Sequence, residues 1–167
     1  YRKQLNDALS VVNLGGDVYT IYNTTEARVY GSTLAYQAKD VWCSGIDVDS
    51  RFEFTYDEID VYNSDEVEPL SKTAPFTAYV KAGHNGLFTE WLYAPKDGRQ
   101  SSNDLSDVRI YEHNDGYNVV NFGYEGSYKH LDYSLVLQNA FDNDGRILGS
   151  SVDVPGRSIV TSVAYRF

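Results

Sequence analysis

Residues 158–167 read S-I-V-T-S-V-A-Y-R-F, and this stretch decides the fold class. Its odd positions are apolar apart from Thr161, whereas its even positions are small or polar apart from Val160. An alternation with a period of two residues predicts a β-strand whose two faces lie in different environments. The sequence ends on Phe167, an aromatic of the apolar face, whereas a terminal strand of a soluble domain usually runs on into a few polar residues.

The same alternation recurs along the chain and predicts an antiparallel all-β fold of about eight strands. It is clearest at residues 46–59, where one face carries Ile46, Val48, Phe52, Phe54 and Tyr56 and the other carries Asp47, Asp49, Arg51, Glu53 and Asp57. A soluble sandwich would bury the first face and solvate the second, so alternation alone does not separate a soluble fold from a membrane one. The other strands are expected at residues 1–12, 18–39, 76–82, 87–94, 117–128, 131–141 and 158–167.

The expected connections alternate in length over most of the chain. Tight turns are predicted at residues 40–45, at 83–86 with the Asn-Gly hairpin signal, and at 128–130. Long polar connections are predicted at residues 60–72, 96–116 and 142–157, whereas the turn at 13–17 is short for its side of the sheet. Long loops on one side and tight turns on the other are typical of outer-membrane barrels, with the tight turns periplasmic.

Composition limits the possible classes of protein. The 167 residues include 15 Tyr, 7 Phe and 2 Trp, which suits the aromatic girdles of a membrane barrel. The net charge of −10 argues against nucleic acid as a partner, because phosphate binding needs a basic surface. The single cysteine, Cys43, excludes an internal disulfide framework. Since residue 1 is Tyr and no signal peptide precedes it, we expect a fragment of a longer secreted chain.

Three segments together resemble the C-terminal third of a TonB-dependent outer-membrane receptor. They are Y-N-T-T-E-A-R-V-Y-G at residues 22–31, the stretch from G-Y-N-V-V-N to L-Q-N-A-F-D-N-D within residues 116–144, and P-G-R at 155–157 followed by the terminal strand. Their order and spacing match the family over essentially the whole chain. Two positions depart from the family pattern, because Ala140 stands where Leu is usual and Gly145 where an aromatic is common.

The resemblance implies that residues 1–167 are the last part of one barrel domain of about 22 strands, without the plug and N-terminal strands. It implies a bacterial outer-membrane location with a periplasmic C-terminus. The implied function is transport and not catalysis: uptake of a scarce nutrient, most commonly a ferric siderophore, with cobalamin, haem or a glycan as other options. The implied partners are outer-membrane lipid, the cargo, the periplasmic TonB protein through the missing part, and the barrel-assembly machinery.

Candidate binding residues follow from location alone. The predicted outer loops contain Tyr62, Asp65, Glu66, Asp104, Arg109 and His113. The resemblance makes Val163, Tyr165 and Phe167 the barrel-assembly signal. We expect no cofactor, and no metal site either: the D-N-D-G stretch at residues 142–145 lacks the later ligands of a calcium loop and favours a turn at a strand end.

Two other functions remain open from the sequence. The first is a self-contained eight-stranded barrel with a structural or adhesive role, since an even strand count permits closure. The second is a soluble β-sandwich that binds sugar on loop aromatics. The acidic positions Asp47, Asp49, Glu53 and Asp57 favour a hydrated lumen wall over an ion site, and as a functional surface they would favour neutral or cationic cargo.

Overall fold

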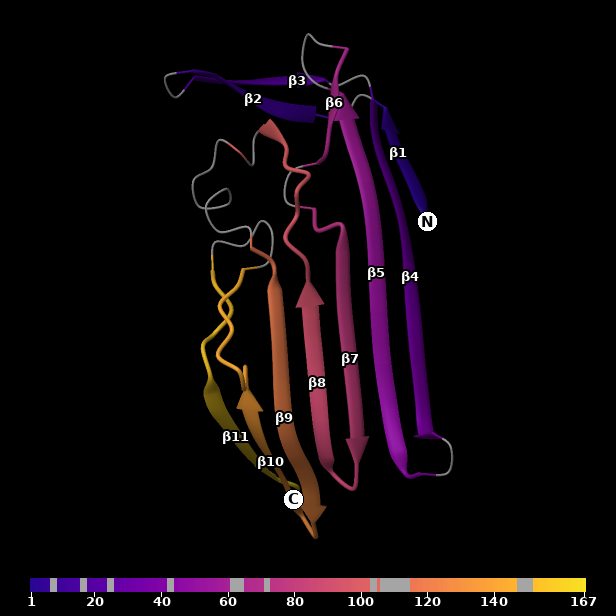
Figure 1. The fold of residues 1–167 in the computed structure, drawn as a ribbon, viewed down its shortest axis with the longest axis vertical. Coiled ribbons are helices and arrows are strands. Elements are labelled where there is room, and N and C mark those ends of the chain that lie inside the picture. The colour runs from indigo at the N-terminus through magenta and orange to yellow at the C-terminus, as the bar shows by residue number, and fades with distance from the viewer. Residues whose placement is uncertain are drawn as a thin grey trace.

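A computed structural model of the chain describes residues 1–6, 9–15, 18–23, 26–41, 44–60, 65–70, 73–102, 105, 115–146 and 152–167. The described residues form an all-β fold dominated by one antiparallel sheet (Figure 1). Its strands follow the order β1-β4-β5-β7-β8-β9-β10-β11, and the short β6 pairs with the end of β5. The strands are β1 (Arg2–Asn6), β4 (Glu26–Val41), β5 (Ile46–Asp60), β6 (Val67–Glu68), β7 (Phe76–His84), β8 (Leu87–Ala94), β9 (Tyr117–Tyr128), β10 (Leu131–Gln138) and β11 (Ser158–Tyr165).

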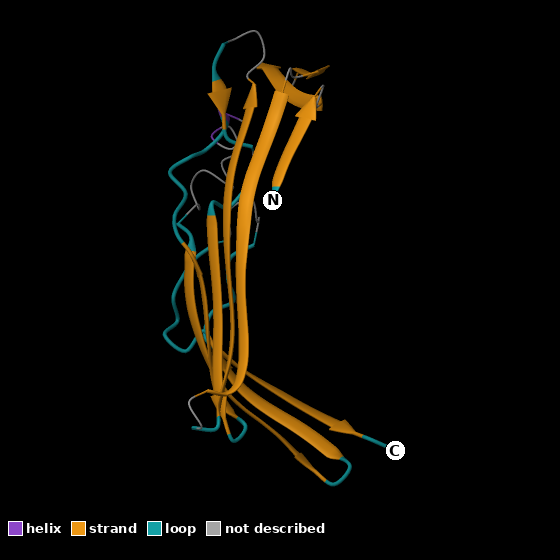
Figure 2. Cartoon of the chain, turned by 90° about the vertical axis from the view of Figure 1, so that its right-hand side faces the viewer, coloured by secondary structure: helices purple, strands orange, loops and turns teal. Residues whose placement is uncertain are grey.

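The sheet is open and curved. β1 and β11 lie at opposite edges and do not pair with each other. Seen from the side, the lower parts of β9, β10 and β11 bend away from the direction of β4 and β5 (Figure 2). A right-handed twist that accumulates over many strands gives a long sheet this kind of curvature.

Tight turns and long connections lie at opposite ends of the sheet, as predicted. The connections between β4 and β5, β7 and β8, and β9 and β10 lie at the end of the sheet where the chain terminates, at the bottom of Figure 1. In the β7–β8 turn, Asn85 has φ 50° and Gly86 has φ 84°, as a two-residue turn of the primed type requires. We call this end the turn end and the opposite one the loop end.

The expectation of one long strand over residues 18–39 is wrong. Residues 18–23 belong to a separate two-stranded sheet, in which β3 (Val18–Asn23) pairs with β2 (Leu9–Gly15). β4 starts afresh at Glu26 and pairs with β1. The β2–β3 hairpin therefore extends from the loop end (Figure 1) and lies in the chain between β1 and β4. The connection from β1 to β4 is therefore long, like the other connections at the loop end, and the sequence-based expectation of a short turn between neighbouring strands of the main sheet does not hold.

Two other strand boundaries differ from the prediction. The strand expected at residues 131–141 ends at Gln138, because Asn139 takes a left-handed backbone with φ 46° and starts a turn. The strand expected at residues 1–12 is divided into β1 and β2, which lie in different sheets. Both boundaries are set by the pairing partner or by the backbone conformation, which the sequence period alone does not detect.

Candidate functional site

The pairing register sorts the side chains of the main sheet onto two chemically different faces. In β4, β5, β7 and β9 the even positions share a face with the odd positions of β8, β10 and β11, as the direct partners Leu34 and Phe52, Val80 and Trp91, and Leu135 and Tyr124 show. This face is apolar and aromatic. The opposite, polar face carries, among others, Gln37, Asp47, Asp49, Arg51, Glu53, Lys81, Glu90, Asn121, Glu125, Asp132, Ser134, Ser162 and Arg166.

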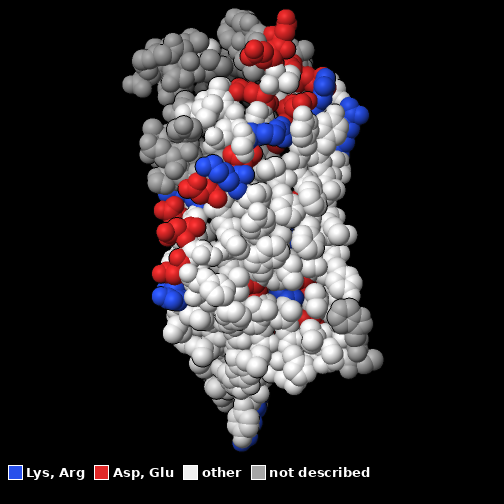
Figure 3. Space-filling model, in the orientation of Figure 1, with Lys and Arg blue, Asp and Glu red and all other residues white. Residues whose placement is uncertain are grey.

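The apolar face is not covered by any other described element. Val163 is 70% exposed, Leu34 64% and Leu135 52%. In Figure 3 the charged side chains gather at the loop end and along one upper margin, whereas a broad uncharged surface covers the strands below. An apolar surface of this extent is far larger than the isolated exposed side chains of a soluble monomer and indicates contact with an apolar partner.

Aromatic side chains on this face lie in two groups at different heights. The group nearer the loop end comprises Tyr30, Phe54, Tyr56, Phe76, Trp91 and Tyr93, with ring centroids of neighbours 4.8–6.5 Å apart. The group nearer the turn end comprises Tyr124, Tyr128, Tyr133, Tyr165 and Phe167. Tyr124 is paired with Leu87, which lies four residues from Trp91 and six residues from Tyr93 on the same strand, so about 13 to 20 Å separates the two groups at ~3.3 Å per residue. Mostly aliphatic side chains lie between the groups.

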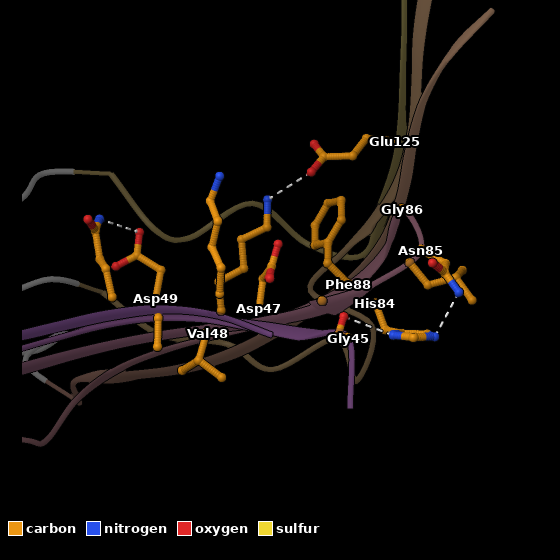
Figure 4. A pocket seen from close by; sticks show the side chains of 15 residues that line it. Gly45, Asp47, Val48, Asp49, His84, Asn85, Gly86, Phe88 and Glu125 are labelled. Carbon is orange, nitrogen blue, oxygen red and sulfur yellow. Dashed lines mark hydrogen bonds and ion pairs between the residues drawn. The ribbon is translucent and has the colours of Figure 1, made fainter. Parts of the chain in front are cut away.

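The polar face is the concave one. Figure 4 shows Asp47 and Asp49 on one side of their strand and Val48 on the other, and the strand that carries Glu125 rises on the side of the two aspartates. The hollow that these residues line has a volume of about 520 Å³ and lies near the turn end. Gln37 Nε2 donates to Oδ2 of Asp49, its direct partner on the neighbouring strand, at 3.2 Å.

Lys81 is the centre of the charge network on the polar face. Its Nζ lies 3.9 Å from Glu90 Oε1 and 3.7 Å from Glu125 Oε1. The same Nζ lies 3.9 Å from the centroid of the Phe88 ring, which is a cation–π distance. Asn121 extends the network, because its Nδ2 donates to Glu90 Oε2 at 3.2 Å. The charged and polar side chains of this network therefore find partners within the sheet itself, with no second layer formed by the described residues above them.

The turn end is held together by contacts between neighbouring turns. His84 Nδ1 lies 2.9 Å from the carbonyl oxygen of Gly45, which belongs to the β4–β5 connection (Figure 4). Asn85 Nδ2 lies 2.7 Å from His84 Nε2. Since the amide nitrogen can only donate, Nε2 accepts and Nδ1 carries the proton given to Gly45. His84 is thus an exposed structural link between two turns.

At the loop end, one asparagine organises the connection between β10 and β11. Asn139 is 2% exposed, and its Nδ2 donates to the carbonyl oxygens of Asn143 at 2.9 Å and Pro155 at 3.0 Å. Its Oδ1 accepts from the Asn143 amide at 3.0 Å, and its own amide donates to Asn121 Oδ1 at 2.9 Å. The sequence analysis did not identify Asn139. A signal was present, because asparagine tolerates a left-handed backbone and its side chain caps turns, so an Asn at the end of an alternating stretch favours a turn.

The D-N-D-G stretch at residues 142–145 begins with the last residue of a turn at the end of β10, in which the Asp142 amide donates to the carbonyl oxygen of Asn139 at 2.8 Å. Asp142 has φ 56°, and its Oδ1 accepts from the Arg157 amide at 2.7 Å. Asn143 Nδ2 donates to the carbonyl oxygen of Asn118 at 2.8 Å. These polar groups therefore fix the ends of β9, β10 and β11 relative to one another. Among the described residues, no group of three or more His, Cys, Asp or Glu side chains is placed to hold a metal ion.

The acidic side chains of β5 lie in two different environments. Asp47 and Asp49 line the open hollow, whereas Asp57 is only 3% exposed. Asp57 Oδ1 accepts from the Leu70 amide at 2.9 Å, and its carbonyl oxygen accepts from Arg99 Nη2 at 2.7 Å. Asp57 is therefore a loop anchor, and not part of a hydrated wall as predicted.

Most of the predicted binding residues cannot be brought together into a site. Tyr62, Asp104, Arg109 and His113 lie outside the described residues. Asp65 and Glu66 are exposed immediately before β6 at the loop end. The predicted assembly residues Val163, Tyr165 and Phe167 share the apolar face at the turn end, where the rings of the last two meet at 5.2 Å between centroids.

The chain matches no known family model, and no curated protein matches it. The described residues contain no helix with the length and apolarity needed to cross a membrane.

Proposed function

We propose that the chain forms part of the wall of an outer-membrane β-barrel, the C-terminal part of a TonB-dependent receptor that takes up a scarce nutrient. The observation that carries the proposal is the uncovered convex face, with its two aromatic groups about 13 to 20 Å apart. A lipid-facing barrel wall has an apolar band about 25 Å tall between two aromatic girdles. Water would leave this whole surface unfavourably exposed, whereas hydrocarbon stabilises it.

The concave face supports the same proposal. A barrel of this class has a polar interior, and the charges of this sheet, such as Arg51, Lys81 and Glu90, point to the concave side of the strands. The polar face carries more carboxylates than cations, with Asp47, Asp49, Glu53, Glu90, Glu125 and Asp132 against Arg51, Lys81 and Arg166. Such a wall favours neutral or cationic cargo over anionic cargo.

The open sheet favours a segment of a larger barrel over a self-contained small one. In an eight-stranded barrel β1 and β11 would pair and remove both edges, whereas in this sheet they lie at opposite edges. Under the proposal further strands cover these edges, the long connections face the exterior and capture cargo, and the turn end faces the periplasm. Passage then depends on the plug and the TonB protein, which act through parts of the receptor outside residues 1–167.

The test uses the native polypeptide in its bacterial host. We expect it in the outer-membrane fraction after carbonate extraction, with a mass several times that of residues 1–167. Deletion of its gene should abolish growth on one sole iron source or on cobalamin, and the intact gene should restore growth. A native protein that is a soluble monomer without detergent would refute the membrane proposal. A membrane-bound native chain no longer than residues 1–167 would refute the receptor and favour the self-contained small barrel.

A further inference from the structure

The boundary between the apolar face and the loop end carries three arginines in a defined arrangement. Three successive rows of paired residues run down this face: Gln4, Arg28 and Glu58; then Arg2, Tyr30 and Tyr56; then Ser32, Phe54 and Phe76. Successive rows are two residues, or about 7 Å, apart. The face thus changes from charged to aromatic to apolar within about 13 Å, which is the profile of a bilayer interface.

Two arginines flank the tyrosines of the middle row. The Cζ atom of Arg2 lies 5.4 Å from the centroid of Tyr30, and that of Arg99 lies 4.2 Å from the centroid of Tyr56. The two tyrosine rings are 6.5 Å apart. Arg99 comes from the connection after β8, and its Nη2 is fixed by the carbonyl oxygen of Asp57. Stacking on the tyrosine rings holds both guanidinium groups at the height of the tyrosine row.

The charge partners of these arginines differ. Arg28 is paired with Glu26, with 2.6 Å between Nε and Oε1. Within the described part of the chain, no carboxylate lies at ion-pair distance from Arg2 or Arg99, and the side chain of Arg2 donates to the amide oxygen of Gln4 at 3.1 Å. Among these described residues, both arginines therefore keep N–H groups that no acceptor uses.

We propose that this guanidinium rim, Arg2, Arg28 and Arg99 with Tyr30 and Tyr56, binds the phosphate group of a lipid headgroup. The inference rests on the proposed membrane function, because it places the rim at the edge of the hydrocarbon. A guanidinium group presents two parallel donors that match a phosphate, and the partly desolvated interface strengthens the contact. The carboxylates of Glu26, Glu58 and Asp60 balance the three guanidinium groups in number, so the N–H groups of Arg2 and Arg99, and not a net positive charge, carry the inference.

The test measures lipid binding by the native full-length polypeptide. The protein is placed in nanodiscs of phosphatidylcholine with a small fraction of phosphatidic acid, and bound phosphatidic acid is counted by native mass spectrometry. Arg2→Gln and Arg99→Gln are each expected to weaken this binding about fivefold, since one arginine near an anionic surface contributes ~1 kcal/mol. The matched control is Arg51→Gln, which removes an exposed, ion-paired arginine from the polar face and should change nothing.

The outcomes separate this inference from the proposed function. Flotation with pure phosphatidylcholine liposomes tests membrane insertion alone, and its failure would refute the membrane function. If all variants float normally and bind phosphatidic acid as wild type does, the guanidinium rim is not a phosphate-binding site. Competition by millimolar inorganic phosphate as strong as by the lipid would replace a headgroup site with a free-anion site. Arg99→Lys keeps the charge, so loss of binding in Arg99→Gln but not in Arg99→Lys excludes misfolding of the 95–116 connection as the cause.

Discussion

The ring of Phe88 covers Gly123, its direct partner on the neighbouring strand, on the concave face. A Cβ atom at residue 123 would overlap the ring. The same ring lies beside Lys81, whose cation is thereby held between Phe88 and two glutamates. Because residue 123 has no side chain, the Phe88 ring can lie over it, and the ring in turn positions the Lys81 cation. An aromatic ring that covers a glycine on the neighbouring strand is a cross-strand pair that stabilises a sheet.

Replacing Gly123 by alanine should therefore destabilise the sheet. The added methyl group must displace Phe88 and with it the contact to Lys81, and overpacking of this kind costs about 1–3 kcal/mol. Urea unfolding of the protein from phosphatidylcholine vesicles, followed by tryptophan fluorescence, measures the loss. Gly98→Ala is the control, because a Cβ there meets nothing within 4 Å. Equal stability of the two variants would show that Phe88 is free to move.

Charge should be tolerated on one face of β10 and not on the other. Leu135→Arg places a guanidinium on the face that we propose contacts hydrocarbon, which costs about 2–4 kcal/mol near the middle of a bilayer. Ser134→Arg, on the adjacent polar-face residue, should cost much less. Unfolding from vesicles gives both values. If Leu135→Arg proved as harmless as Ser134→Arg, the convex face would be in water.

Asn139 should contribute more to stability than any exposed asparagine. Asn139→Gly keeps the left-handed backbone accessible but removes three side-chain hydrogen bonds, at about 1 kcal/mol each. We expect a loss of roughly 3 kcal/mol and faster proteolysis of the 139–157 connection. Asn85→Gly is matched to it, since Asn85 also has a positive φ but is exposed and makes only one side-chain hydrogen bond among the described residues, to His84, so its loss should cost about 1 kcal/mol or less. Similar losses for both would assign the effect to backbone conformation alone.

The pairing of β1 with β4 should weaken in acid. The hydrogen bond from Arg28 holds the pKa of the Glu26 carboxyl below its ordinary value, at a position beyond the aromatic row. A lowered folded-state pKa means that the carboxylate stabilises the fold above its unfolded pKa of about 4.3, and that this contribution disappears as the pH falls through the folded value. Wild type should thus be more stable than Glu26→Gln at pH 7, and the difference should shrink as the pH falls below the unfolded pKa.

The sequence by itself determined the class of the fold and the division into two faces. The alternation in residues 46–59 and 158–167 requires nothing beyond the period of a strand, and the Asn85-Gly86 turn follows from the left-handed backbone that both residues accept. Tight turns and long connections could be assigned to opposite ends for the same local reason.

Only the tertiary structure decided which residues meet. The contact of Phe88 with Gly123 depends on the register of β8 against β9, and the row that joins Arg2, Tyr30, Tyr56 and Arg99 draws on four segments of the chain. The separation of the β2–β3 hairpin from β4 is likewise a matter of pairing partner and not of periodicity. Strand period is a property of neighbours along the chain, whereas register and strand order are set by side chains that lie far apart in sequence.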